Sequence, residues 1–273
     1  MSAERPAGRR LVALDIDGTV MHEDGTITDA VIEAIGRVVA QGDEVMLATG
    51  RSPSTTLPVV ARLGIAPEFV VCCNGAVTLR RDPEAEGGYR PDVVETFDPT
   101  DVLQTIRGAL ANGAYGVESP DGRYLLSGQF PDDAMTKHGD HVPFEQLLGV
   151  QATRVVVISP EHGLEEFLQI VDRMGLHKVS YNVGWTAWLD IAPEGVTKAT
   201  AMERVREWFD IPRSRVFAAG DGRNDIDMLR WASTSGRGVA MGQAPSDVVD
   251  AASEVTGGVT DDGLAAALDT LPR

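Results

Sequence analysis

The chain has few cysteines, few basic residues and no long apolar run, and each shortage excludes a class of protein. Its 2 cysteines, Cys72 and Cys73, are adjacent, so they provide no disulfide framework and favour a reducing cytoplasm. Lysine and arginine number 24 against 41 acidic residues, for a formal net charge of -17. Nucleic acid and anionic membranes attract basic surfaces, so we expect neither as a main partner. No apolar run approaches the roughly 20 residues of a membrane-spanning helix.

Apolar residues are nevertheless plentiful, at 43% of 273 residues, which is enough to build one large or two medium domains. Residues 1–10 are polar and lack the apolar segment of a signal peptide, so we expect a disordered tail. From Leu11 onward, short apolar runs alternate with segments such as 31–38, where apolar residues recur at helical spacing. Alternating strands and helices predict a parallel sheet.

This alternation is interrupted in the middle of the chain. Residues 80–92 are charged and contain two prolines and a Gly-Gly pair, a composition typical of a domain boundary. Mixed strand and helix patterns follow, and the regular alternation returns after Ile191. We therefore predict an α/β fold in which residues 11–82 and 189–273 form a parallel-sheet core, and residues 83–188 form an inserted α+β domain.

Two carboxylates follow the first apolar strand, which covers residues 11–14. Asp15 and Asp17 are two residues apart, so on a strand they point to the same side. Gly18 lets the backbone approach a ligand closely, and the carboxyl ends of parallel strands are where ligands bind. Because neighbouring carboxylates repel, the pair predicts Mg²⁺, a division of roles between the two groups, or both.

Three more polar clusters stand at strand ends or helix starts of the predicted core: Thr49-Gly50-Arg51, Lys198 and Gly220-Asp221-Gly222-Arg223-Asn224-Asp225. A hard divalent cation prefers oxygen ligands, and Asp15 and Asp221 can supply them from different strands. Lys198 offers a positive charge and Thr49 a hydroxyl donor to a phosphate. The set matches an aspartate nucleophile, an aspartate acid/base, Mg²⁺ and phosphate-holding groups.

Each cluster alone also has a structural interpretation. Asp-x-Asp-Gly occurs in turns and in calcium loops, although Val20 and Met21 break the ligand pattern of an EF-hand. Lys198 alone suits a solvated helix position, and Gly220-Asp221-Gly222 alone suits a plain turn. All four clusters in order at predicted strand ends or helix starts favour catalysis over this sum of separate explanations.

Other polar and aromatic residues give weaker signals. Arg51 and Arg223 suit either a substrate phosphate or a surface ion pair, and we leave both open. Trp185 and Trp188 fall on opposite faces of one strand, where core packing is favoured over substrate contact. No metal-site spacing is present among the histidines, which are His22, His138, His141, His162 and His177.

Together, the four motifs resemble those of the haloacid dehalogenase superfamily of phosphatases in order and spacing. Three further segments narrow the resemblance to its Cof-type branch, class IIB: Asn74-Gly75-Ala76, Gly195-Val196-Thr197-Lys198 and Met241-Gly242-Gln243-Ala244. The resemblance covers roughly residues 10–80 and 189–271, with one small departure at Gln243, where that branch usually has asparagine. It implies a Rossmann-like core and makes residues 83–188 the cap domain.

The resemblance also implies roles for individual residues. Asp15 would attack phosphorus and become an aspartyl-phosphate, while Asp17 would protonate the leaving oxygen and then activate water. The implied phosphate-binding group consists of Thr49, Gly50, Lys198 and Asn224. The implied Mg²⁺ ligands are Asp15, the backbone carbonyl of Asp17, Asp221 and Asp225, the last as a ligand or as a support. Asn224 would orient Asp221 or contact the phosphate.

We therefore predict a cytoplasmic enzyme that hydrolyses small phosphorylated metabolites with Mg²⁺, sugar phosphates being the favoured class. Its cap would open and close on crossings near residues 80–92 and 184–192. A phosphomutase or a dedicated sugar-phosphate phosphatase on the same scaffold is the alternative, and an inactive ligand-binding module is the second. We expect a monomer or small homo-oligomer. The sequence leaves open the metabolite and the cap residues that select it.

Overall fold

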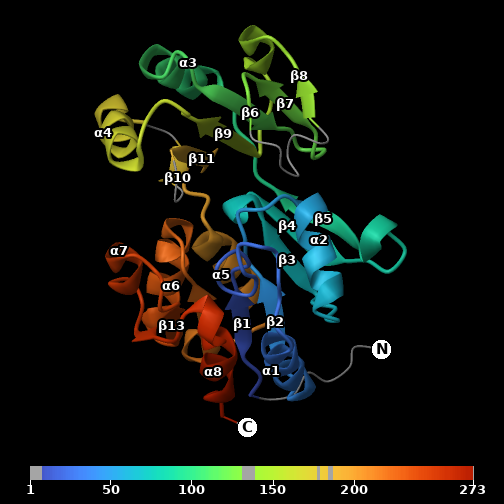
Figure 1. The fold of residues 1–273 in the computed structure, drawn as a ribbon. Helices are drawn as coiled ribbons and strands as arrows, with labels where there is room; N and C mark the ends of the chain where they lie inside the picture. The colour runs from blue at the N-terminus through green and yellow to red at the C-terminus, as the bar shows by residue number, and fades with distance from the viewer. Residues whose placement is uncertain (1–7, 131–138, 177–178, 184–186, 273) are drawn as a thin grey trace.

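The structure is a computed structural model, and it describes residues 8–130, 139–176, 179–183 and 187–272 (Figure 1). The chain forms a core with a smaller cap above it, and the described chain begins and ends at the side of the core away from the cap. Among the described helices, none has the length and apolar content needed to span a membrane.

The core is built on a five-stranded parallel sheet in the order β14-β13-β12-β1-β2. Its strands are β1 (Leu11–Leu14), β2 (Glu44–Leu47), β12 (Val216–Gly220), β13 (Arg237–Ala240) and β14 (Glu254–Val255). A parallel bridge between Ala48 and Val71 attaches β3 (Phe69–Cys72) beside β2. This arrangement brings the carboxyl ends of β1, β2, β3 and β12 to one edge of the sheet.

Helices cover both faces of this sheet, which explains why β1 is apolar at all four positions and fully buried. Val12 and Leu14 pack with α1 (Asp29–Ala40) and α8 (Gly263–Asp269), and α2 (Pro53–Arg62) joins the same apolar cluster. Leu11 and Ala13 pack on the other side with α5 (Lys198–Trp208) and α6 (Ile226–Ser233). The short helix α7 (Ser246–Val249) lies beside α6.

The helix predicted from the spacing of residues 31–38 is confirmed as α1. Thr28 caps it by accepting a hydrogen bond from the Val31 backbone N–H at 3.3 Å. Trp208 is 41% exposed. Trp208 stands at the end of α5, where its ring lies 4.8 Å from that of Phe69.

A second, antiparallel sheet extends from the core and consists of β3, β4 (Val77–Arg81) and β5 (Tyr89–Val94). The short 3₁₀ turn η1 (Cys73–Gly75) joins β3 to β4, and η2 (Glu86–Gly88) lies in the hairpin before β5. Within the described chain, β5 pairs only with β4. Its Pro91, which has no N–H to donate, suits such an edge position.

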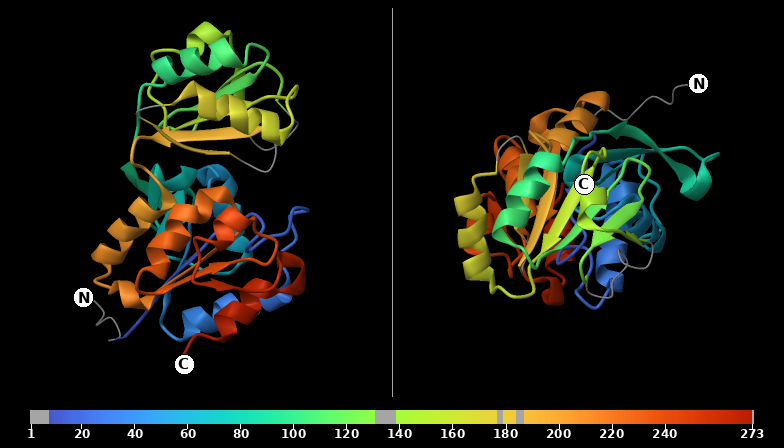
Figure 2. Two further views of the ribbon diagram at one scale, coloured as in Figure 1. Left: turned by 90° about the vertical axis from the view of Figure 1, so that its left-hand side faces the viewer. Right: turned by 90° about the horizontal axis from the view of Figure 1, so that it is seen from above.

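The cap contains a six-stranded sheet in the order β10-β11-β9-β6-β7-β8. Its strands are β6 (Ala114–Glu118), β7 (Tyr124–Ser127), β8 (Gly139–His141), β9 (Arg154–Ile158), β10 (Val179–Val183) and β11 (Trp188–Pro193). Apolar side chains from one sheet face pack against α3 (Thr100–Ala109) and α4 (Leu164–Met174). These helices lie on the side away from the core, so the opposite face of the sheet is turned toward it (Figure 2).

The predicted α/β fold, with a Rossmann-like parallel core and an inserted α+β cap, is confirmed. The strand pairing does not follow the domain limits that we predicted at 82–83 and 188–189. Strand β5 pairs with β4 of the core, and β11 pairs with β9 of the cap. Glu95 bonds to Ala76 in the core, whereas Phe97 bonds to Ala152 in the cap. We therefore propose that the chain crosses near Thr96 and again within residues 194–197.

Two local segments differ from what their composition suggests. The charged hairpin of residues 82–88 has the composition of a linker, yet it joins two paired strands. Part of the predicted tail is anchored, since the Arg10 backbone N–H and guanidinium both donate to Asp43 at 2.7 Å. Residues 1–7, together with Trp185, His138 and His177, lie outside the described residues.

Candidate active site

Three buried charges meet where β1, α5 and the turn after β12 converge. The Lys198 ammonium donates to Asp15 Oδ1 and to Asp225 Oδ1, each at 2.7 Å. Asp15 follows β1 directly, and Lys198 opens α5, whose N-cap Thr197 accepts a hydrogen bond from the Thr200 N–H. The apolar strand and the capped helix thus hold opposite charges in contact without solvent between them.

A cluster of three carboxylates surrounds this lysine. Asp15, Asp221 and Asp225 each offer an oxygen within 4.8 Å of the others, and all three residues are buried. Burial raises the pKa of Asp15, and the carboxylate of Asp225 raises it further while Lys198 opposes both. Burial and then Asp225 raise the pKa of Asp221 to about 7. The site therefore holds more negative charge than its single lysine offsets.

Lys198 stays charged in this environment. Burial alone would lower its pKa, but the carboxylates of Asp15 and Asp225 more than compensate, and the net pKa is raised. The lysine is fully buried, with its side chain at 0% exposure. A permanent positive charge beside Asp15 is what an incoming anion requires.

Asp225 has both carboxylate oxygens engaged. Oδ1 accepts from Lys198, and Oδ2 accepts the backbone N–H groups of Asp221 at 3.1 Å and Gly222 at 3.0 Å. These bonds fix the turn that presents Asp221. The engagement of Asp225 favours a supporting role for it and leaves Asp15 and Asp221 as the better placed cation ligands.

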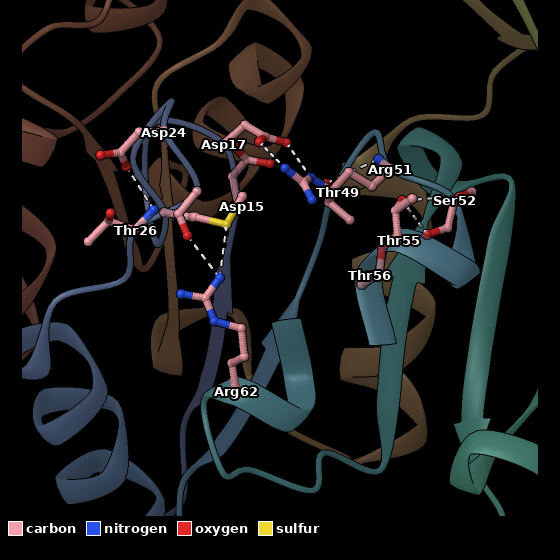
Figure 3. A network of polar contacts seen from close by, with 12 residues as sticks. Asp15, Asp17, Asp24, Thr26, Thr49, Arg51, Ser52, Thr55, Thr56 and Arg62 are labelled. Atoms are coloured by element: carbon pink, nitrogen blue, oxygen red, sulfur yellow. Dashed lines mark hydrogen bonds and ion pairs between the residues drawn. The ribbon is translucent and has the colours of Figure 1, made fainter. Parts of the chain in front are cut away.

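Asp17 points away from this cluster. Its side chain is 59% exposed and accepts two hydrogen bonds from Arg51, from Nε at 2.7 Å and from Nη2 at 2.5 Å (Figure 3). Arg51 is thus an ion-pair partner of Asp17, and Arg223 pairs with Asp247 at 2.8 Å. The backbone carbonyl of Asp17 as a cation ligand stays a prediction.

The remaining predicted phosphate-binding residues line the same edge of the sheet. Thr49 is buried after β2, and its hydroxyl accepts the Arg51 backbone N–H at 3.1 Å. Asn224 donates from Nδ2 to Asn74 Oδ1 at 3.0 Å. A Cβ at Gly50 would lie 3.1 Å from Asn74 Oδ1 and 3.5 Å from Asn224 Nδ2, so Gly50 lies beside this amide pair.

Asn74 is a site neighbour that our residue assignments missed. It is 5% exposed and has a positive φ of 51°, a left-handed conformation that asparagine tolerates better than most residues. The sequence signal was its Asn-Gly turn, which we interpreted only as a turn and as part of the family resemblance.

Gln243 is a second residue that the sequence underrated. Its Nε2 donates to Gly18 O at 2.6 Å and to Asp221 Oδ2 at 3.2 Å, while its Oε1 accepts the Val259 N–H at 3.0 Å. This amide ties Asp221 to the loop after β1. Gly18 is required there, since a Cβ on it would lie 2.1 Å from Asp221 Oδ2.

The cap closes over this edge of the core. Cys73, in the turn η1 directly after β3, donates from Sγ to Glu118 Oε2 of β6 at 3.6 Å, and both side chains are buried. On the other side, β10 contacts the turn that carries Asn224 and Asp225. The two cysteines are unpaired, and burial raises the pKa of each thiol, that of Cys72 to about 12.

The donor set fits a divalent cation together with an anion. Carboxylate oxygens are the ligands that Mg²⁺ prefers, and a divalent charge would offset the repulsion that raises the pKa values of Asp15 and Asp221. Asp15 and Asp221 would hold the cation, with Asp225 behind them. Lys198 contacts Asp15 directly, and Thr49 and Asn224 lie at the same edge of the sheet, where each could donate a hydrogen bond to a phosphate.

Comparison with known proteins agrees with this geometry. The sequence profile of the haloacid dehalogenase-like hydrolase family matches residues 12–268. The 5-amino-6-(5-phospho-D-ribitylamino)uracil phosphatase YitU of Bacillus subtilis is 25% identical, over 93% of this chain and 94% of YitU. The pyridoxal phosphate phosphatase YbhA of Escherichia coli is 28% identical, over 94% of this chain and 96% of YbhA.

Solved structures show the same fold. The HAD subclass IIB sugar phosphatase BT4131 has a TM-score of 0.77 at 22% identity, covering 95% of this chain and 98% of that one. TM0651 from Thermotoga maritima has a TM-score of 0.72 at 22% identity, covering 97% of this chain and 98% of that one. The match includes the cap as well as the core.

Proposed function

The chain belongs to the haloacid dehalogenase-like hydrolase family, and we propose that this phosphoric monoester hydrolase uses Mg²⁺ to cleave small phosphorylated metabolites. Sugar phosphates are the favoured class, and the reaction passes through an aspartyl-phosphate on Asp15. The observation that carries the proposal is the buried contact of Lys198 with Asp15 beside the carboxylates of Asp221 and Asp225. Two relatives named for small phosphorylated substrates support it.

In the first step, an Asp15 oxygen attacks phosphorus and the bond from phosphorus to the leaving oxygen breaks. Asp17 gives a proton to that oxygen. Asp15 and Asp221 would hold the divalent cation, which would supply positive charge against the repulsion between carboxylate and phosphate. Lys198 adds a fixed charge, and Thr49 and Asn224 donate hydrogen bonds to the phosphoryl oxygens.

In the second step, water attacks the phosphorus of the aspartyl-phosphate. Asp17 accepts the water proton, phosphate leaves, and Asp15 returns as a carboxylate. Because Asp17 is paired with Arg51 in the structure, proton transfer requires Asp17 to exchange Arg51 for the leaving oxygen. The closed cap keeps bulk water from the site during the first step.

The test of the nucleophile is Asp15→Asn assayed with p-nitrophenyl phosphate and Mg²⁺. An amide is a poor nucleophile and a weaker cation ligand, so turnover should fall by at least about a thousandfold. Asp24→Asn is the matched control, since Asp24 lies in an exposed turn, where its carboxylate accepts the Thr26 N–H at 2.8 Å. Asp15→Asn activity close to wild type would exclude Asp15 as the nucleophile.

Product analysis separates the alternatives on this scaffold. Free phosphate from a sugar phosphate identifies a hydrolase, whereas an isomerised sugar phosphate identifies a mutase. No turnover with any phosphomonoester would favour a ligand-binding module. We also propose a cytoplasmic location, supported by the two unpaired cysteines.

A further inference from the structure

The backbone of the turn η1, between β3 and β4, is bonded to the turn that follows β2. The Cys73 N–H donates to Arg51 O at 2.9 Å, and the Asn74 N–H donates to Thr49 O at 3.0 Å. The second of these turns carries Thr49, one of the proposed phosphate donors. The position of Asn74 is therefore tied to that edge of the site before its side chain is considered.

The backbone of η1 is also strained. Cys73 and Asn74 have φ values of 52° and 51°, and within the described ranges they are the only adjacent non-glycine residues with a positive φ. A left-handed conformation costs an L-residue roughly 1–2 kcal/mol, although asparagine tolerates it better than most, whereas glycine adopts it freely. Such strain concentrates at functional sites. An asparagine where glycine would be unstrained indicates that the side chain of residue 74 has a task.

The side chain of Asn74 holds the amide of Asn224. Asn74 is buried, and its Oδ1 accepts a hydrogen bond from Asn224 Nδ2 at 3.0 Å. Within the described part of the chain, this is the only hydrogen bond of the Asn224 side chain. The other end of the amide lies against Gly222, since a Cβ there would be 2.6 Å from Asn224 Oδ1. The carbonyl of Asn224 thus faces Gly222, and its amino group faces Asn74.

The orientation of this amide decides whether Asn224 attracts or repels a phosphate. A primary amide has two N–H donors and one acceptor oxygen. With one N–H on Asn74, the second N–H is available to a phosphoryl oxygen. A flipped amide would instead present its carbonyl oxygen, which repels a phosphate. The flip would also place the Asn224 oxygen against Asn74 Oδ1, so Asn74 disfavours it.

The amide pair lies beside the turn that follows β2. A Cβ at Gly50 would be 3.3 Å from Asn74 Nδ2 and 3.5 Å from Asn224 Nδ2. Gly50 and Thr49 are both among the proposed phosphate-binding residues. The amino group of Asn224 is therefore directed to the same turn as the other proposed donors.

We propose that Asn74 is a positioning residue of the phosphatase reaction, whose Oδ1 keeps the Asn224 amide turned with an N–H toward the phosphoryl group. The proposal rests on the proposed function, in which Asn224 donates to a phosphoryl oxygen. It gives a role to a residue outside the four motifs. Asn74 acts through Asn224 and forms no bond to the reacting atoms.

Asn74→Gly tests the proposal, because glycine keeps the left-handed backbone accessible and removes the side-chain acceptor. With p-nitrophenyl phosphate and Mg²⁺, kcat/KM should fall by at least about fivefold, less than the roughly 10²–10³-fold cost of removing an oxyanion donor altogether. Asp210→Gly is the matched control, since Asp210 is exposed just after α5 and has a φ of 52°. Its kcat/KM should equal that of wild type.

A double-mutant cycle separates positioning from a general structural role. Asn224→Ala alone should lower kcat/KM by at least about tenfold. In the Asn224→Ala background, Asn74→Gly should change kcat/KM by less than about twofold, because no amide remains to be oriented.

Losses that multiply in the double variant, or Asn224→Ala activity close to wild type, would overturn the proposal for Asn74 while leaving the phosphatase proposal intact. Equal losses in Asn74→Gly and Asp210→Gly would overturn it in the same way. Failure of wild type to hydrolyse p-nitrophenyl phosphate or any other phosphomonoester would instead overturn the proposed function, and the role of Asn74 with it.

A measurement on wild type replaces the variant if Asn74→Gly does not fold, as judged by circular dichroism. In ¹⁵N-labelled protein, the side-chain NH₂ of Asn224 is the signal that Asn224→Ala lacks. Mg²⁺ with vanadate, which mimics the phosphoryl group, should shift one of its two protons, while the other keeps its nuclear Overhauser contact with Asn74. A complex in which neither proton shifts, or in which the contact with Asn74 is lost, would contradict the proposal.

Discussion

At the scale of single residues, the site is a problem of charge balance. Lys198 is the only described cation in direct contact with Asp15 and Asp225, and it is fully buried. Without it, two carboxylates would face each other in a region of low polarity. We therefore expect Lys198 to matter for stability as well as for the proposed phosphate binding.

Replacing this lysine should damage both properties. Lys198→Met should lower kcat/KM by at least about a hundredfold, because a fixed charge beside the phosphate is lost. The free energy of unfolding should fall by about 3–5 kcal/mol near neutral pH, the usual cost of leaving a buried charge unpaired. Urea denaturation and steady-state kinetics measure the two effects. Unchanged stability would show that the carboxylates do not depend on Lys198.

Asp221 gives a pH dependence with a definite sign. Burial and the carboxylate of Asp225 raise the pKa of Asp221 from 3.8 to about 7. Between about pH 4 and pH 7, Asp221 is therefore protonated in the cation-free folded state but ionised in the unfolded state. The stability from this proton is complete below about pH 4 and is lost as pH rises through about 7. Mg²⁺ competes with the proton, so its stabilisation should grow over the same range.

The measurement is the melting temperature between about pH 5 and pH 8, with and without Mg²⁺, for wild type and Asp221→Asn. The increase caused by Mg²⁺ should be larger at the upper pH for wild type. Asp221→Asn should show little increase at either pH, since it lacks a cation ligand. An equal increase at both pH values in wild type would contradict the assignment of Asp221.

At the scale of secondary structure, a close backbone contact positions the start of α5, the helix that begins with Lys198. Gly75, in the turn after β3, has a φ of +106°, and a Cβ on it would lie 2.2 Å from the Thr197 carbonyl oxygen. Thr197 is the N-cap of α5, and Lys198 is its first residue. The turn and the helix start therefore fit together only because residue 75 is a glycine.

Gly75→Ala should displace the start of α5 and with it Lys198. We expect the unfolding free energy to fall by about 1–3 kcal/mol, with a loss of kcat larger than the stability loss explains. Gly64→Ala is the control, since Gly64 also has a positive φ, +64°, but has no atom within 4 Å of the added Cβ. Equal effects on kcat in both variants would mean that the Gly75–Thr197 contact does not position Lys198.

The same scale shows what could be predicted from the sequence. The sequence predicted β1 from the apolar run at 11–14, because a strand buried on both faces is apolar at every position. It predicted α1 from residues 31–38, because a helix buried on one face repeats its apolar residues at helical spacing. Residues 80–92 were interpreted as a domain boundary from their composition, which does not show that residues 82–88 join the paired strands β4 and β5.

Long-range contacts limited the prediction of the site. The order of the motifs predicted that Asp15, Lys198 and Asp221 meet at the carboxyl edge of the sheet, because parallel strands end on the same side. Asn74 and Gln243 were missed as site neighbours because their contacts join segments 150 and 225 residues apart, to Asn224 and Gly18 respectively. The outward direction of Asp17 depends on Arg51, an interaction that the sequence left open.

At the scale of the whole molecule, we propose that the cap opens to admit substrate. Cys73 lies at the seam between core and cap, 1% exposed, with its thiol against Glu118. Cys72 belongs with Cys73 to the apolar core cluster, but it is 0% exposed and its thiol contacts Thr56 of α2. Opening the cap would therefore expose Cys73 and leave Cys72 covered.

Thiol labelling with Ellman's reagent should consequently report cap opening. One thiol should react in the native protein, and Mg²⁺ with vanadate, a phosphate analogue, should slow it at least about fivefold by favouring the closed state. Cys73→Ser should remove this reaction, leaving Cys72 unreactive until global unfolding. A labelling rate that is unaffected by Mg²⁺ and vanadate would contradict a cap that closes over the phosphate site.

The central claim is that Asp15 takes up the phosphoryl group, and acid quenching of a single turnover tests it most directly. With ³²P-labelled substrate and Mg²⁺, we expect an acid-stable label on the protein that hydroxylamine releases. Borohydride reduction and mass spectrometry should then locate homoserine at position 15. Phosphate release without a protein-bound label throughout the turnover, or a label on a residue other than Asp15, would contradict the account.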